Sequence, residues 1–223
     1  MPSIKVARKV ADTDMTPFVD VAFIILFFFI MATKFKPPEA VEITTPNSVS
    51  SDILEEKDGI LVQFDKEGRV FFTMQTEKDP LKKKTVIQNL NTTRNLGLTE
   101  SEMNNFVKTH SFGVPFTQLK SFLSQPVENQ KDIKQPGIPV SDSANNELYY
   151  WVRDAVAAFA GTKIDYLVKG DNSAKYDAFK NVLSAFKRND IYKFQLVTSP
   201  ESAPEGSDLY NTRQSGGKPV AKN

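Results

Sequence analysis

The longest apolar run of the chain lies near its amino terminus. Between Phe18 and Ala32 every residue is apolar except Asp20. With its flanks the run covers residues 15–35, about 20 residues, which is near the minimum length for a transmembrane helix. Pro17 falls in the first turn of this helix, where its missing N–H costs no hydrogen bond. The pattern therefore predicts a transmembrane helix over residues 15–35, preceded by a short tail of residues 1–14.

Residues 59–198 alternate between the period of a strand and the period of a helix. Ile60 to Phe64 and Val70 to Met74 alternate around a turn at Gly68, which predicts a hairpin. Apolar stripes at helical spacing then predict two helices, each followed by a short strand. Helices that alternate with strands in the order ββαβαβ predict a small α/β two-layer sandwich with its helices on one face of the sheet. The expected helix caps are Asn145 or Asn146 for the first helix and Asp171, Asn172 or Ser173 for the second.

A polar stretch, residues 75–147, follows the second strand of the hairpin. Helical spacing recurs within residues 85–96 and 116–123, and Thr99 with Glu102 forms a capping-box pattern. We therefore predict a helical insertion on one side of the core. The lysine triplet 82–84 is expected to be a solvated helix start, and His110 is expected on a loop in a solvated or capping role.

Two further segments carry the composition of linkers. Residues 36–58 are rich in proline and serine, which predicts an extended tether. Within it, Val41 and Ile43 alternate with polar residues ahead of Pro46, so the alternative is a strand that adds to the sheet edge of its own dimer or of a partner. From residue 199 to 223 the chain is dominated by Pro, Ser, Gly and Glu, which predicts a disordered tail.

Composition excludes several classes of function. The net charge of the 223 residues is +1, which argues against a general nucleic-acid binder because phosphates demand a basic excess. Without cysteine there is no disulfide or thiolate site, and a single histidine excludes a histidine-cluster metal site. We find no convincing paired-carboxylate, nucleophile or nucleotide-binding motif. The chain is therefore expected to be no enzyme and to need no cofactor.

Asp20 is the candidate functional residue of the apolar run. A carboxylate at membrane depth costs about 2.5–3.5 kcal/mol at the helix centre. An ionisable residue at such a position is therefore a candidate functional site. A proton carrier is the first hypothesis, with Thr16 one turn earlier on the same face as a hydrogen-bonding neighbour. The alternatives are a cleaved signal peptide, for which residues 31–34 are a poor cleavage site, and a plain anchor whose Asp20 lies at the interface. Flanking positive charges lean weakly toward an amino terminus on the inner side.

The residues around Asp20 resemble a known family. The string Asp14-Met-Thr-Pro-Phe-Val-Asp20-Val, which opens an apolar helix after a basic tail, is similar to the ExbD/TolR family. The sequence Phe35-Lys-Pro-Pro-Glu39, the long insertion and the block Ser111-Phe-Gly-Val-Pro-Phe116 resemble ExbD proteins of the Bacteroidota. The resemblance covers residues 1–74 and 148–198.

This resemblance implies a function and a topology. In the family the tail is cytoplasmic, one helix crosses the bacterial inner membrane and the folded domain is periplasmic. It implies that Asp20 carries protons, supported by Thr16 and Pro17. The implied partners are an ExbB-type multi-span membrane protein, a second copy of the chain and a TonB-type energy transducer that opens outer-membrane receptors. Val41, Ile43 and Pro46 match a segment that docks as a strand.

Two other functions remain open at this stage. One is a TolR-like subunit of a Tol-Pal envelope system with a TolQ-type partner. The other is a membrane-tethered periplasmic binding module with no proton role for Asp20.

Overall fold

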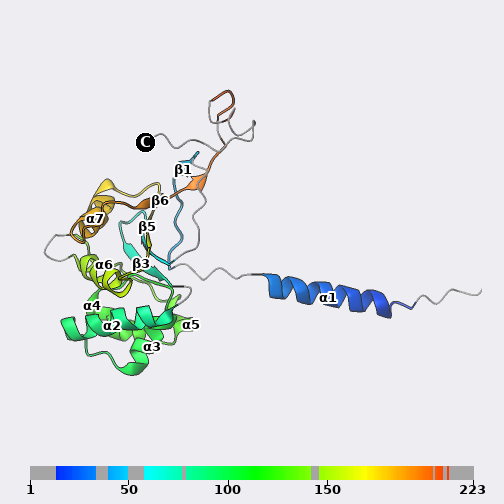
Figure 1. The fold of residues 1–223 in the computed structure, drawn as a ribbon, viewed down its shortest axis with the longest axis horizontal. Helices are drawn as coiled ribbons and strands as arrows, with labels where there is room; N and C mark the ends of the chain where they lie inside the picture. The colour runs from blue at the N-terminus through cyan, green and yellow to red at the C-terminus, as the bar shows by residue number, and fades with distance from the viewer. Residues whose placement is uncertain are drawn as a thin grey trace, which may run out of the picture. The chain divides into compact units, whose positions relative to one another are not determined.

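The computed structural model describes most of the chain in two separate units. The units are residues 1–37 and residues 38–223. The described residues are 14–33, 40–49, 58–76, 79–141, 146–202, 204–207 and 210. The first unit contributes one helix, α1 (Thr16–Ala32), and the second contains all other elements (Figure 1).

The second unit is built on a five-stranded mixed sheet. Its order is β4-β3-β2-β5-β6, in which β2 pairs antiparallel with β3 and parallel with β5. The remaining pairs are antiparallel β3–β4 and parallel β5–β6. The strand bounds are β2 (Gly59–Phe64), β3 (Val70–Gln75), β4 (Ser111–Phe112), β5 (Asp165–Gly170) and β6 (Gln195–Val197).

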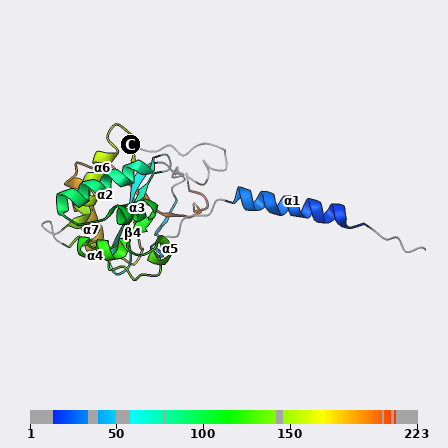
Figure 2. The same ribbon diagram turned by 90° about the horizontal axis from the view of Figure 1, so that it is seen from below.

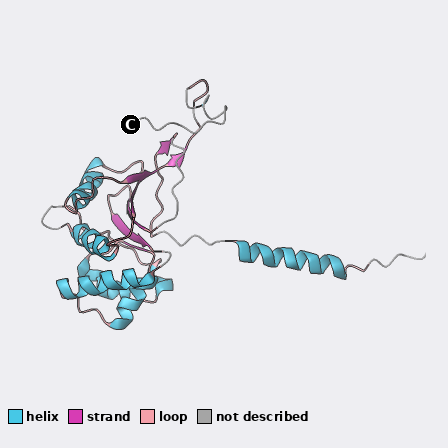
Figure 3. Cartoon of the chain, viewed as in Figure 1, coloured by secondary structure: helices cyan, strands magenta, loops and turns pink. Residues whose placement is uncertain are grey.

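Two helices, α6 (Glu147–Ala158) and α7 (Tyr176–Lys187), cover one face of this sheet (Figures 1 and 3). Alternate strand residues such as Ile60, Phe72 and Val168 are fully buried in the core that they share with these helices. The mixed α/β fold predicted from the sequence is therefore confirmed.

The predicted caps of these two helices have different outcomes. The Asn146 side chain accepts the backbone N–H of Tyr149 at 3.1 Å, which confirms the predicted cap of α6. The predicted cap of α7 is wrong, because the helix begins at Tyr176 after Lys175 and has no side-chain cap. Asp171 lies too far upstream to cap it and instead closes a turn by accepting the N–H of Ser173 at 2.8 Å.

The described residues of the insertion form four helices and one strand between β3 and α6. Its elements are α2 (Pro80–Arg94), α3 (Glu100–Lys108), β4, α4 (Phe116–Leu123) and α5 (Val127–Gln130). The helical insertion predicted from the sequence also contains a strand, β4, which extends the sheet at the outer edge of β3. The capping box of α3 is confirmed: Glu102 N–H donates to Thr99 Oγ1 at 3.3 Å, and Thr99 N–H donates to Glu102 Oε2 at 2.7 Å.

The insertion shares its core with the rest of the unit. Helix α2 packs against α6, and the insertion gathers beside that helix in both views (Figure 2). The indole ring of Trp151, on α6, is fully buried and packs against four aromatic rings. One ring comes from β3 and three from the insertion: Phe72, Phe106, Phe112 and Phe116. The insertion is therefore part of the folded domain and not an appended lobe.

Two predictions about the ends of the domain are wrong in part. The tether of residues 36–58 contains β1 (Asn47–Ser48), and the tail of residues 199–223 contains β7 (Ser199–Pro200). These short strands pair in parallel, Asn47 with Ser199 and Ser48 with Pro200. Backbone hydrogen bonds hold the two segments to each other. The rest of both predictions falls largely on residues outside the described part of the chain.

Candidate functional site

Helix α1 presents its apolar side chains on all sides. None of its residues is buried, and large side chains such as Phe18 and Met31 are 66% and 74% exposed. Asp20 lies in the second turn, as the sequence predicts, and Pro17 lies in the first. Among the described residues, no helix combines the length and the apolar character needed to cross a membrane. Residues 34 and 35 of the predicted span lie outside the described part, so the transmembrane helix over 15–35 stays a prediction.

The residue predicted to support Asp20 has another partner. The backbone N–H of Thr16 donates to Asp14 Oδ1 at 3.0 Å, just before the helix begins. Hydrogen bonds from the Thr16 side chain and backbone lower the pKa of Asp14 below its ordinary value. Thr16 therefore organises the start of α1, and its predicted bond to Asp20 is not formed in this structure.

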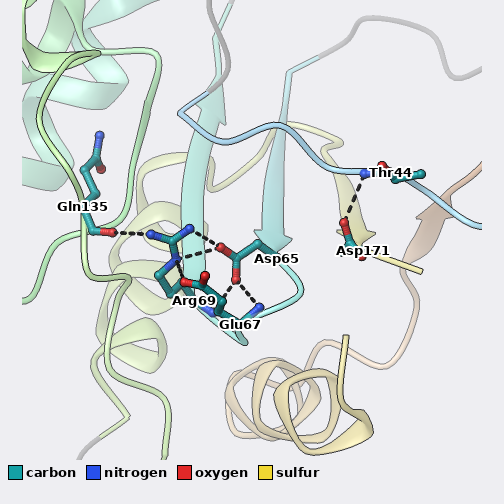
Figure 4. A network of polar contacts seen from close by, with 6 residues as sticks. All are labelled: Thr44, Asp65, Glu67, Arg69, Gln135 and Asp171. Atoms are coloured by element: carbon teal, nitrogen blue, oxygen red, sulfur yellow. Dashed lines mark hydrogen bonds and ion pairs between the residues drawn. The ribbon is translucent and has the colours of Figure 1, made fainter. Parts of the chain in front are cut away.

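The predicted docking segment lies against the domain at the end of β5. Asn172 N–H donates to the Thr44 carbonyl oxygen at 2.8 Å, and Thr44 N–H donates to Asp171 Oδ2 at 3.2 Å (Figure 4). Both backbone groups of Thr44 are thus bound by consecutive residues of one loop. In the segment, Ile43 is 9% exposed and Val41 is half-buried, while Glu42 and Thr44 are exposed. The alternation seen in the sequence therefore separates an inner face from an outer face.

A second set of contacts holds the same segment after β6. Ser199 N–H donates to the Pro46 carbonyl oxygen at 3.0 Å, and Glu201 N–H donates to that of Ser48 at 2.9 Å. The hydroxyl oxygens of Thr45 and Ser199 lie 2.6 Å apart, within hydrogen-bonding distance. Residues 40–49, called the docked linker from here on, are therefore fixed at two points of their own domain. Docking onto a partner or a second copy stays a prediction.

The sequence analysis did not single out Asp65, which closes the β2–β3 hairpin. Its carboxylate is almost fully buried and accepts the backbone N–H groups of Glu67 at 3.0 Å and Arg69 at 2.9 Å. Arg69 adds an ion pair to a single oxygen, with Nε and Nη2 at 2.7 and 2.6 Å from Asp65 Oδ2. The same guanidinium reaches Glu67 and the backbone oxygen of Gln135, which ties the hairpin turn to the last loop of the insertion (Figure 4).

We expect Asp171→Ala to loosen the docked linker. The substitution removes the acceptor of the Thr44 and Ser173 N–H groups, and a hydrogen bond of this kind contributes about 1 kcal/mol. Hydrogen exchange of the backbone amides in residues 40–49 should therefore become about fivefold faster. The control is Asp177→Ala, which removes an exposed carboxylate of α7. Equal exchange in the two variants would contradict the role given to Asp171.

Comparison with known protein families gives a match that covers both units. A family model described as Biopolymer transport protein ExbD/TolR matches residues 7–201, which extend from before α1 to just after β7. The chain belongs to the ExbD/TolR family. Comparisons with curated proteins and with solved structures give no match.

Membership in the ExbD/TolR family gives the chain a general role. Its members are energy-transduction subunits of biopolymer transport and generally work with ExbB- or TolQ-type membrane partners. They are typically anchored in the inner membrane and carry a periplasmic domain. The match also includes the docked linker and β7, so the paired segments belong to the family region of the chain.

Proposed function

We propose that this chain is the proton-carrying subunit of an ExbB-ExbD type motor that energises TonB-dependent transport across the outer membrane. The observation that carries the proposal is the family match over residues 7–201 together with an apolar helix whose only charged residue is Asp20. In this proposal residues 15–35 cross the inner membrane, the amino terminus is cytoplasmic and the α/β domain is periplasmic. The chain has no enzymatic role in it.

The exposed apolar surface of α1 supports an environment of lipid and partner helices. A helix that is apolar on every side is stable in a membrane or inside a larger protein, and not in water. Three apolar residues, Ile24, Phe27 and Met31, continue the face of Asp20 toward the other end of the helix. A proton that reaches Asp20 therefore finds no second charged group on this face, and an ExbB-type partner must supply the rest of the path.

The energy available to such a site is set by the membrane potential. One elementary charge that crosses 100 mV releases about 2.3 kcal/mol. A charged Asp20 would seek a polar group of the partner, whereas a protonated one tolerates an apolar surface. Alternate loading and release of the proton thus gives two preferred orientations of α1 against its partner. Each cycle would drive rotation of one set of helices against the other.

Loss of the whole chain distinguishes the ExbD branch from the TolR branch. We expect a deletion strain to lose TonB-dependent uptake of siderophores and to keep its resistance to detergent. The measurement is uptake of an iron-loaded siderophore beside growth on a detergent plate, each with the gene restored as control. Normal uptake with detergent sensitivity would instead assign the chain to a Tol-Pal type system.

A further inference from the structure

A small pocket, lined mostly by residues with polar side chains, lies where the docked linker meets the insertion. Its volume is about 50 Å³, enough for a few water molecules or one carboxylate group, since one water needs roughly 10–15 Å³ by this measure. Ala40 supplies the linker side of the pocket, and no lining residue carries a carboxylate. The lining residues are Ala40, Thr109, His110, Ser111, Val127, Gln130, Lys131 and Gln135.

Two buried amide side chains give this pocket fixed walls. Gln130 is 4% exposed and is held by Thr109, whose hydroxyl donates to Gln130 Oε1 at 2.8 Å, and by its own bond to the Gln125 carbonyl oxygen. Gln135 is 6% exposed, and its Oε1 accepts the N–H of Gly113. This bond leaves Gln135 Nε2 without a partner among the described residues. The pocket therefore offers a preorganised N–H donor.

The titratable residues that line or directly back the pocket are basic. The Lys83 side chain is buried behind the wall, where its ammonium donates to the Thr109 carbonyl oxygen at 3.0 Å and forms no ion pair with any described residue. This corrects the prediction of a solvated lysine triplet. Burial lowers the pKa of Lys83, and burial together with the charge of Lys83 lowers the pKa of His110.

Lys131 adds an exposed ammonium to the lining of the pocket. The neighbouring carboxylates of Glu128 and Asp132 are exposed and do not line the pocket.

We propose that this pocket binds a single carboxylate group, carried by a small acid or by an acidic side chain of a peptide. The amide of Gln135, the imidazole of His110 and the ammonium of Lys131 supply the donors, and the volume limits the ligand to one planar anionic group. Because Ala40 forms part of the lining, the site is complete only while the linker is docked. The proposal does not depend on a proton role for Asp20.

The single histidine of the chain makes the test direct. Full-length protein in detergent micelles, produced without a histidine tag, gives one imidazole signal by NMR. The probes are acetate and an acetylated, amidated Ala-Glu-Ala peptide, with sodium chloride at equal ionic strength and the Ala-Gln-Ala peptide as controls. Either carboxylate, but neither control, should shift the His110 signal in a saturable way. Equal shifts with the controls would overturn the proposal.

Matched lysine variants test the position of the ligand. Lys131→Ala should weaken carboxylate binding about threefold, as expected for the loss of one exposed ion pair. Lys134→Ala removes an exposed ammonium of the same loop outside the pocket and should leave binding unchanged. Equal weakening in both variants would show general charge attraction and contradict a site at this position.

The pH dependence gives a second readout. A bound carboxylate favours the charged imidazole and so raises the pKa of His110 from its lowered value in the empty pocket. Ligand binding then takes up a proton, and affinity should increase as the pH falls from 8 to 6. In His110→Gln this increase should disappear. An equally pH-dependent affinity in that variant would remove His110 from the site.

Discussion

Asp20→Asn is expected to reduce TonB-dependent siderophore uptake about tenfold or more while the complex still assembles. Asparagine has nearly the same size as aspartate and keeps a polar group at the same depth, but it neither binds nor releases a proton at physiological pH. If the membrane potential acts through this carboxyl group, its loss removes the energy of each charge transfer, about 2.3 kcal/mol per 100 mV. The measurement is uptake in cells, together with the amount of the variant and its copurification with the ExbB-type partner.

The matched control for this experiment is Asp14→Asn. It makes the same chemical change just before α1, and the side-chain oxygen of asparagine can still accept the Thr16 N–H. Uptake should therefore stay near the level of the unmodified protein. Normal uptake in the Asp20 variant, combined with detergent sensitivity, would support a TolR-like role. Normal behaviour in both assays would leave a tethered binding module with no proton role for Asp20.

Trp151→Ala should destabilise the α/β domain by about 3–5 kcal/mol, the usual cost of removing a large buried aromatic side chain. The indole contacts rings from β3, α3, β4 and α4, so its loss opens a cavity between the sheet and the insertion. The free energy of unfolding is measured by urea titration of the full-length protein in detergent. Circular dichroism is the appropriate signal, because the chain has no other tryptophan to report by fluorescence.

Two substitutions calibrate the effect of losing Trp151. Tyr192→Ala removes an aromatic ring that is 70% exposed and should change stability by less than about 0.5 kcal/mol. Trp151→Phe should cost less than alanine, because it keeps one ring and removes the buried indole N–H, which has no partner among the described residues. A loss below about 1 kcal/mol for Trp151→Ala would mean that the insertion does not depend on this cluster.

The elements best predicted from the sequence are those whose buried apolar residues repeat over a long stretch. Helices α6 and α7 each repeat their apolar positions over three turns, so their existence and inward faces follow from spacing alone. Strand β4 was missed because it has only two residues, too few to show the alternation that is typical of a strand. Lys83 was misjudged as solvated although it falls three and four residues before Val86 and Ile87. That spacing places its aliphatic stem on the buried face of α2.

Only those features of the candidate site that depend on neighbouring residues in the sequence could be predicted. Asp20 stands out because one acid interrupts an apolar run. The role of Asp171 was hidden, since its carboxylate acts on Thr44, which lies far away in the sequence. Asn, Asp and Ser before a helix usually indicate a cap, and nothing local shows that a distant backbone N–H will use the carboxylate instead. The pairing of β1 with β7 depends on the same kind of remote contact.

The docked linker also sets the maximum length of the connection between α1 and the domain. Six residues, 34–39, connect the end of the α1 region to the first docked residue, and at about 3.4 Å each they extend no further than about 20 Å. With residues 40–49 released, the connection grows to residues 34–49 and about 54 Å at the same length per residue. A short connection becomes fully extended after a small displacement of the helix, whereas a long connection allows a larger displacement before it is taut. The hydrogen bonds at Thr44 and β1 therefore set the length of chain that is free to extend between α1 and the domain.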